Sequence, residues 1–339
     1  MVNANQRIDG FTFDSGSVTS FLHLSQKEQW EDGDLESFLS TNGMRFISQY
    51  EEWDRDSGKD GLTELGKGKK VKETALGISS WNPLKANREI IQENYDILVN
   101  SWNEIIGQAF STVKEFLPPW NHCEGTCFLV PAGDHLTYSS GEGCAVNIGM
   151  GKFTLPEWRF MIASMVYRVY LFSFLRSRSQ NGNQGTPLEM VEKLLGITHR
   201  EGLSTYVGTC AADDPEVTEH YAVTDEDISL YESSFLNVIE KDSFNEELIR
   251  PGSPLTCSAA RIGREMARVI DESGRETGYK LGRDMLLGTL ASLGFLPFFH
   301  MYRMTSSNGC ITEPVWTAYD AVKRARGLYT VREDFFFIG

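Results

Sequence analysis

Residues 156–175, PEWRFMIASMVYRVYLFSFL, decide the fold of this chain. Pro156 suits the first turn of a helix, Glu157 complements the positive end of the helix dipole, and no glycine interrupts the stretch. Apolar residues would lie on nearly every side of this helix, so we expect it at the centre of a large core. Arg159 and Arg168 make it a poor membrane span.

If this helix is central, the buried charge of Arg168 needs an explanation. A guanidinium is always charged, and desolvating it without a partner costs several kcal/mol. We therefore expect Arg168 to pair with a carboxylate or to reach solvent. Glu201, in the segment 199–207 (HREGLSTYV), is the natural candidate.

The rest of the chain predicts an α+β fold that is predominantly α-helical. Two short apolar runs, 127–131 (CFLVP) and 144–149 (CAVNIG), predict neighbouring strands of a small sheet. Apolar residues at helical intervals predict helices over 82–116, 187–195, 225–240, 261–273 and 278–293. Residues 10–24 suggest a strand or an extended arm, and the charged, glycine-rich segment 51–70 suggests a solvated loop.

Length and composition exclude several classes of protein. The 339 residues are consistent with one compact body or with two lobes: residues 1–175, with N-terminal helices, the small sheet and the central helix, and residues 176–339, a helical lobe. A net charge of −15 disfavours nucleic acid and anionic membranes as partners. Six scattered cysteines and an N-terminus without a basic or apolar run predict a cytoplasmic protein with reduced thiols.

Four segments together resemble gluzincin-type zinc-dependent peptidases, in families of unknown function. They are residues 110–131, 145–149 (AVNIG), 201–207 (EGLSTYV) and 278–283 (GYKLGR). The resemblance implies a zincin-like scaffold whose small sheet lies beside a central buried helix, with an edge strand that offers main-chain groups to an extended substrate. It also implies that Glu201 occupies the position of the third zinc ligand and that Tyr279 lines the active cleft.

The sequence departs from this family at the metal. His-Glu-x-x-His is absent, and aligning the central helix places Ser164 and Arg168 at the two histidines and Met165 at the general base. Zinc sites need about three nitrogen, sulfur or oxygen ligands from the protein, and only Glu201 is left. We therefore expect no metal and no cofactor, with Arg168 and Glu201 facing each other across the former zinc site.

Glu201 and Tyr279 are the candidate catalytic residues. Glu201 could act as a general acid or base, or could only pair with Arg168. Tyr279 could donate to an oxyanion, or could be a core residue beside closely packed glycines. His199 does not share a helix face with Glu201 and is more often a satisfied histidine than a catalyst. The candidate binding residues are Arg168, His199, Tyr206, Arg283, Ser164 and Tyr167.

Three functions remain open. The preferred hypothesis is a degenerate peptidase scaffold that performs metal-independent acid/base chemistry, such as isomerisation, cyclisation or elimination, on a small organic molecule. The alternatives are a non-catalytic pseudo-peptidase that binds a peptide or a protein partner, and a zinc-dependent hydrolase with unrecognised ligands. The apolar residues 335–338 (FFFI) are expected to dock on the body or on a second copy in a homodimer.

Overall fold

The computed structural model describes residues 5–8, 10–52, 55–69, 81–118, 124–176, 186–241, 257–276, 283–306 and 309–327. Tyr279 and the apolar residues 335–338 lie outside these ranges. The chain divides into two compact units. The first comprises Met1–Arg176 and Val207–His220, and the second comprises Ser177–Tyr206 and Tyr221–Gly339.

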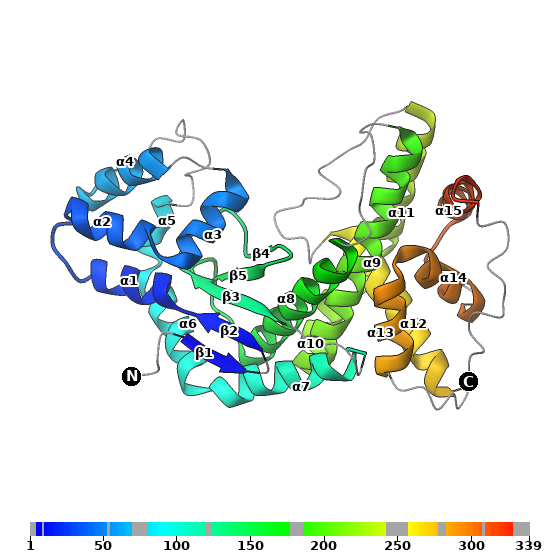
Figure 1. Cartoon of the computed structure of the whole chain (residues 1–339), viewed down its shortest axis with the longest axis horizontal. Coiled ribbons are helices and arrows are strands. Elements are labelled where there is room, and N and C mark those ends of the chain that lie inside the picture. The colour runs from blue at the N-terminus through cyan, green and yellow to red at the C-terminus, as the bar shows by residue number, and fades with distance from the viewer. Residues whose placement is uncertain are drawn as a thin grey trace. The chain divides into compact units, whose positions relative to one another are not determined.

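The first unit contains a mixed five-stranded sheet with the order β1-β2-β3-β5-β4 (Figure 1). Its strands are β1 (Asn5–Ile8), β2 (Phe11–Asp14), β3 (Gly125–Val130), β4 (Thr137–Ser139) and β5 (Gly143–Asn147). The three inner strands are parallel, and β1 and β4 are antiparallel edges. The two predicted strands are therefore confirmed as neighbours, with Cys127 opposite Cys144. All of β5 is buried, as expected for a strand that is covered on both faces.

The central helix, α8 (Leu155–Arg176), covers one face of this sheet. Its Met165 and Val166 are completely buried, which confirms the predicted central position within the first unit. Successive side chains of a strand point to opposite faces. On β3, Gly125 lies against Val169 of α8, and Phe128 packs on the ring of Phe46 in α3 (Asn42–Glu51). The helices α8 and α3 therefore pack on opposite faces.

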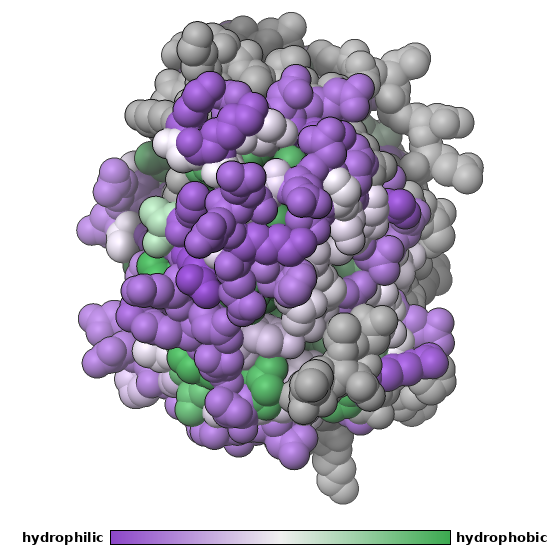
Figure 2. Space-filling model, turned by 90° about the vertical axis from the view of Figure 1, so that its left-hand side faces the viewer, coloured by the Kyte–Doolittle hydropathy of each residue, from purple (hydrophilic) through white to green (hydrophobic). Residues whose placement is uncertain are grey.

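The remaining helices of the first unit come from the N-terminal region and from residues 207–220. They are α1 (Gly16–Leu24), α2 (Asp32–Leu39), α4 (Arg55–Gly66), α5 (Trp81–Ala86), α6 (Arg88–Asn100), α7 (Gln108–Glu115) and α10 (Pro215–His220), with a π-helical turn, η2 (Asn103–Gly107), between α6 and α7. Hydrophilic side chains cover most of the face of this unit that carries α2 and α4 (Figure 2).

One local prediction was wrong in this unit, and a second was correct only in part. Residues 55–66, predicted as loop, form α4, because burying Leu62 and Leu65 stabilises the helix by about 1.5–3 kcal/mol each and outweighs the cost of its glycines. Residues 10–24 are extended only over β2. They then turn into α1, where Asp14 accepts a hydrogen bond from the Gly16 amide (2.7 Å).

The second unit is helical. Its elements are α9 (Pro187–Ala212), whose last six residues belong to the first unit, α11 (Asp225–Lys241), α12 (Ser258–Glu276), α13 (Arg283–Leu293), α14 (Phe295–Thr305) and α15 (Glu313–Ala325). The expected short helix 187–195 is only the beginning of α9, which runs without interruption through Glu201. Thr186 and Glu189 hydrogen-bond each other's main-chain N–H groups and so form a capping box at its start.

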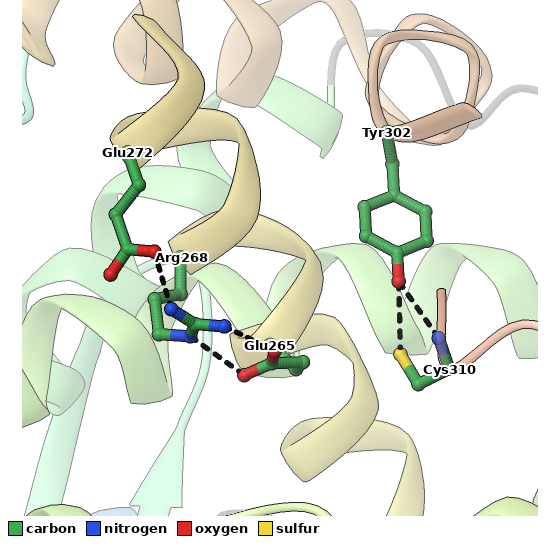
Figure 3. A network of polar contacts seen from close by, with 5 residues as sticks. All are labelled: Glu265, Arg268, Glu272, Tyr302 and Cys310. Carbon is green, nitrogen blue, oxygen red and sulfur yellow. Dashed lines mark hydrogen bonds and ion pairs between the residues drawn. The ribbon is translucent and has the colours of Figure 1, made fainter. Parts of the chain in front are cut away.

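Polar side chains of α12 contact one another, and Tyr302 near the end of α14 contacts Cys310 (Figure 3). The guanidinium of Arg268 binds Glu265 through two hydrogen bonds and also contacts Glu272. The hydroxyl of Tyr302 accepts a hydrogen bond from the Cys310 amide (2.9 Å) and lies 3.4 Å from the Cys310 sulfur. Burial raises the pKa of the Cys310 thiol to about 11, so this cysteine is protonated at neutral pH.

The described residues thus form an α+β protein that is predominantly helical, with one small mixed sheet beside a buried helix. This confirms the coarse fold class. Within the same ranges, no helix is both long enough and apolar enough to cross a membrane.

Candidate functional site

The second unit brings α9 and α12 into direct backbone contact at two glycines. A Cβ added to Gly202 would lie 2.3 Å from the Cα of Gly263, and one added to Gly263 would lie 2.0 Å from the carbonyl oxygen of Thr198. No side chain fits at either position, so the contact requires glycine on both helices. The residues next to the two glycines, Glu201 and Arg264, are both buried.

A tyrosine, a carboxylate and a guanidinium meet farther along the same two helices. The Tyr206 hydroxyl of α9 donates a hydrogen bond to Oδ2 of Asp271 on α12 (2.7 Å). Nε of Arg283, the first residue of α13, donates to the same oxygen (3.2 Å). Tyr206 and Asp271 are 5% and 3% exposed, whereas the Arg283 side chain keeps 27% of its surface in solvent. Asp271 therefore connects a buried hydroxyl with a cation that reaches the surface.

This group is unusual because the charged carboxylate of Asp271 is buried inside a helical core. Buried ion pairs contribute little net stability, since desolvation offsets their mutual attraction, whereas losing one partner costs about 3–5 kcal/mol. Well-packed apolar residues would serve stability at least as well. Tyr206, Asp271 and Arg283 are therefore candidates for function as well as for structure.

His199 has a structural environment in the same unit. Its ring is buried, packs edge-on against Phe298 of α14 (5.2 Å between centroids), and its Nε2 lies 3.2 Å from the carbonyl oxygen of Leu290 in α13. Burial, together with the nearby Arg200, lowers the pKa of His199 to about 3. The imidazole is therefore neutral at physiological pH, and this geometry favours the structural interpretation over a binding role.

The hydroxyl groups of Thr198 and Tyr231 form a second buried hydrogen bond. Their oxygen atoms lie 2.7 Å apart, between α9 and α11. Burial raises the pKa of Tyr231 well above its usual value. This tyrosine is hydrogen-bonded to a neutral hydroxyl, whereas Tyr206 is hydrogen-bonded to a carboxylate.

Three predicted binding residues lie on α8, in the first unit, and all are buried. The Ser164 side chain abuts Gly208, where an added Cβ would lie 2.0 Å from its Oγ. The Tyr167 hydroxyl donates to the carbonyl of Phe116 (3.4 Å), and Nη1 of Arg168 donates to Oγ of Ser139, the last residue of β4 (3.4 Å). Arg168 therefore ties the central helix to the edge strand.

The structure joins only some of the residues that the sequence selects. Tyr206 and Arg283 meet, and they do so through Asp271, which sequence reasoning missed. Arg168 and Glu201 belong to different units, so their pairing stays a prediction. The sequence contains a pattern that could have identified Asp271. This residue follows Ile270 on the apolar face of an amphipathic helix, three residues after Arg268, where a charged side chain is unexpected.

Metal ligands do not gather in the described ranges, where no group of three or more His, Cys, Asp and Glu side chains could hold an ion. Cys127 is buried within β3, and Cys123, four positions before it, lies outside the described residues. The expectation of a metal-free protein stays a prediction.

Comparison with known proteins identifies no relative of this chain. No family model, curated protein or solved structure matches this chain. The candidate site therefore has to be judged from its own geometry.

Proposed function

We propose that this protein is a metal-independent acid/base enzyme that acts on a small organic molecule, on a zincin-like scaffold without a zinc site. Two features of the first unit support the scaffold: a sheet with parallel inner strands and an antiparallel edge strand, β4, and a buried helix, α8, that contacts this edge. The hydrogen bond from Arg168 to Ser139 joins the two elements at the position where the family would place the second histidine.

The observation that carries the acid/base function is the chain of contacts from Tyr206 through Asp271 to Arg283. A tyrosine that already donates its proton to a carboxylate can accept a proton from a substrate and pass its own proton to that carboxylate. Asp271 then holds the proton, and the guanidinium of Arg283 stays beside it. Returning the proton to a different atom of the substrate completes an isomerisation and restores the starting state.

Solvent-hydrogen exchange tests this proposal without a known substrate. The purified full-length protein is incubated in D₂O, with a chelator present, with a panel of oxo- and hydroxycarboxylic acids, and deuterium incorporation at carbon is followed by ¹H NMR. We expect incorporation into at least one compound by the wild-type protein. Tyr206→Phe should reduce this rate by about 10²-fold or more, the usual contribution of a general acid or base.

Tyr231→Phe is the matched control, because it also deletes one buried hydroxyl from the second unit. Each substitution should lower the free energy of unfolding by about 1–2 kcal/mol, the usual cost of losing a buried hydrogen bond. Only Tyr206→Phe should slow exchange by this factor of about 10². Equal rates in the two variants, or no exchange by the wild-type protein with any compound, would show that the Tyr206 contact is structural and would favour a non-catalytic binding protein.

A further inference from the structure

The end of α3 in the first unit carries a second group of polar and aromatic side chains, independent of the proposed acid/base site. Tyr50 and Glu51 are the last two residues of this helix. They lie beside the segment that joins β3 to β4, at the end of the sheet where the parallel strands β3 and β5 finish. In open sheets, ligands commonly bind outside the carboxyl ends of parallel strands.

The carboxylate of Glu51 is held through one of its two oxygens. Oε1 accepts a hydrogen bond from the Tyr138 hydroxyl (2.5 Å) and another from the Asp134 amide (2.7 Å). The Tyr138 hydroxyl in turn accepts a hydrogen bond from the His135 amide (2.9 Å). Within the described residues no hydrogen bond reaches Oε2, and the side chain of Glu51 is only half-buried. The carboxylate is therefore fixed in place with one oxygen directed away from its partners.

The backbone of the segment before β4 packs closely against the hydroxyl of Tyr138, which positions Glu51. Gly133 has a φ of +132°, and a Cβ added there would lie 2.1 Å from the Tyr138 hydroxyl oxygen. Only glycine permits both this backbone conformation and this approach. Oδ1 of Asn147, at the end of β5, accepts from the Gly149 amide (3.0 Å), and its amide group donates to the Gly133 carbonyl (2.9 Å). These hydrogen bonds and the glycine conformation therefore fix the backbone around Glu51.

An exposed aromatic ring lies next to this carboxylate. Tyr50 is 45% exposed and packs edge-on against the buried ring of Tyr138, with 5.3 Å between centroids and 84° between planes. This contact fixes the Tyr50 ring while much of its surface remains in solvent. An exposed tyrosine face beside a carboxylate is the combination that attracts organic cations, through the ring quadrupole and through charge.

The local electrostatics favour a positive ligand at this position. The carboxyl end of a helix carries a partial negative charge that lysine or arginine commonly offsets. The last turn of α3 contains no basic residue, and the chain as a whole carries a net charge of −15. Burial raises the pKa of Glu51, and the charge of Asp134 adds to this, although the hydrogen bonds from the Tyr138 hydroxyl and the Asp134 amide and the charge of His135 lower it. A cation bound beside the carboxylate would stabilise its ionised form.

We propose that Tyr50 and Glu51 bind the ammonium or guanidinium group of a small organic cation. Oε2 of Glu51 accepts hydrogen bonds from the ligand, and the ring of Tyr50 covers its adjacent methylene groups. Tyr138 and Asp134 are positioning residues that hold the carboxylate through Oε1. Recognition therefore depends on charge, and a neutral molecule of the same shape binds poorly.

Calorimetric titration of the full-length protein with n-butylammonium and n-butylguanidinium chloride, at constant ionic strength, tests the site. We expect saturable binding of at least one of these probes and no detectable binding of n-butanol. Glu51→Gln should weaken binding at least tenfold. It should remain folded, because the glutamine side-chain oxygen can still accept from Tyr138 and Asp134. Tyr50→Leu should weaken binding several-fold, and Tyr50→Phe should preserve it.

Glu104→Gln is the control for non-specific attraction, since it removes one negative charge from an exposed position in the same unit. It should leave the affinity unchanged. The proposal is overturned if neither cation binds, if n-butanol binds as well as the cations, or if Glu104→Gln and Glu51→Gln weaken binding equally. Because the readout is binding in the first unit, failure here leaves the Tyr206 exchange experiment unaffected.

Discussion

Replacing Gly263 by alanine should destabilise the second unit, although alanine is the better helix former. The new Cβ would lie 2.0 Å from the Thr198 carbonyl oxygen and 2.8 Å from the Cα of Gly202. Both are backbone atoms of α9, so rotation of a side chain cannot relieve the clash. An ordinary contact between a Cβ and an oxygen is about 3.4 Å, and α12 would have to move away from α9 by more than about 1 Å to restore it.

The magnitude follows from two opposing terms. Overpacking a close contact costs about 1–3 kcal/mol, and a clash confined to backbone atoms belongs at the upper end of that range. Alanine in place of glycine within a helix returns about 1 kcal/mol. We therefore expect Gly263→Ala to lower the free energy of unfolding by about 2 kcal/mol, which corresponds to a fall in Tm of roughly 4–8 °C for a unit of about 150 residues.

Gly107→Ala is the matched substitution with the opposite expected sign. Gly107 lies in the helical turn η2, and nothing approaches its added Cβ within 4 Å. The same chemical change should there stabilise the first unit by about 0.5–1 kcal/mol. Urea unfolding followed by circular dichroism measures both variants. A Gly263→Ala protein as stable as the wild type would show that α9 and α12 do not meet at these glycines.

Two further predictions concern protonation and metal content. Because the folded pKa of His199 is lowered from 6.5 to about 3, the unfolded chain gains a proton below about pH 6.5 that the folded chain does not bind. The free energy of unfolding should therefore fall by about 2 kcal/mol more between pH 7 and pH 5 in the wild type than in His199→Gln, measured by urea unfolding; parallel losses in the two proteins would contradict a buried neutral imidazole. The purified protein should also carry no stoichiometric zinc, and chelators should leave its Tm unchanged; elemental analysis that finds about one tightly bound zinc per chain would contradict this prediction.

Hydrophobic periodicity carried most of the correct fold predictions. Residues 156–175 are apolar on nearly every side, and the structure buries residues 160–171 of this stretch in α8 against the sheet. The runs at 127–131 and 144–149 were identified by their short, bounded apolar character and form β3 and β5. Both patterns are local, since they depend only on which residues of one segment must avoid water.

Predictions from local composition were wrong where tertiary packing buried residues that composition placed in solvent. Glycine and charge predicted a loop over 51–70, yet Leu62 and Leu65 are buried in α4. Arg264 and Arg268 lie four positions apart on α12, and their identical charge predicts the same exposure for both. Arg268 does pair with nearby acids at the surface, but Arg264 is buried. A sequence shows the charge of a side chain, and packing determines its exposure.

The sequence by itself determined the helical α+β class, the central helix and the adjacent strands, because each depends on local propensity and periodicity. Only the tertiary structure showed that Asp271 joins Tyr206 to Arg283, and that Tyr138 holds Glu51 at the end of α3. These partners are 65, 12 and 87 positions apart in the chain. No local pattern specifies such contacts, because the packing of separate elements decides which distant polar groups share a hydrogen bond.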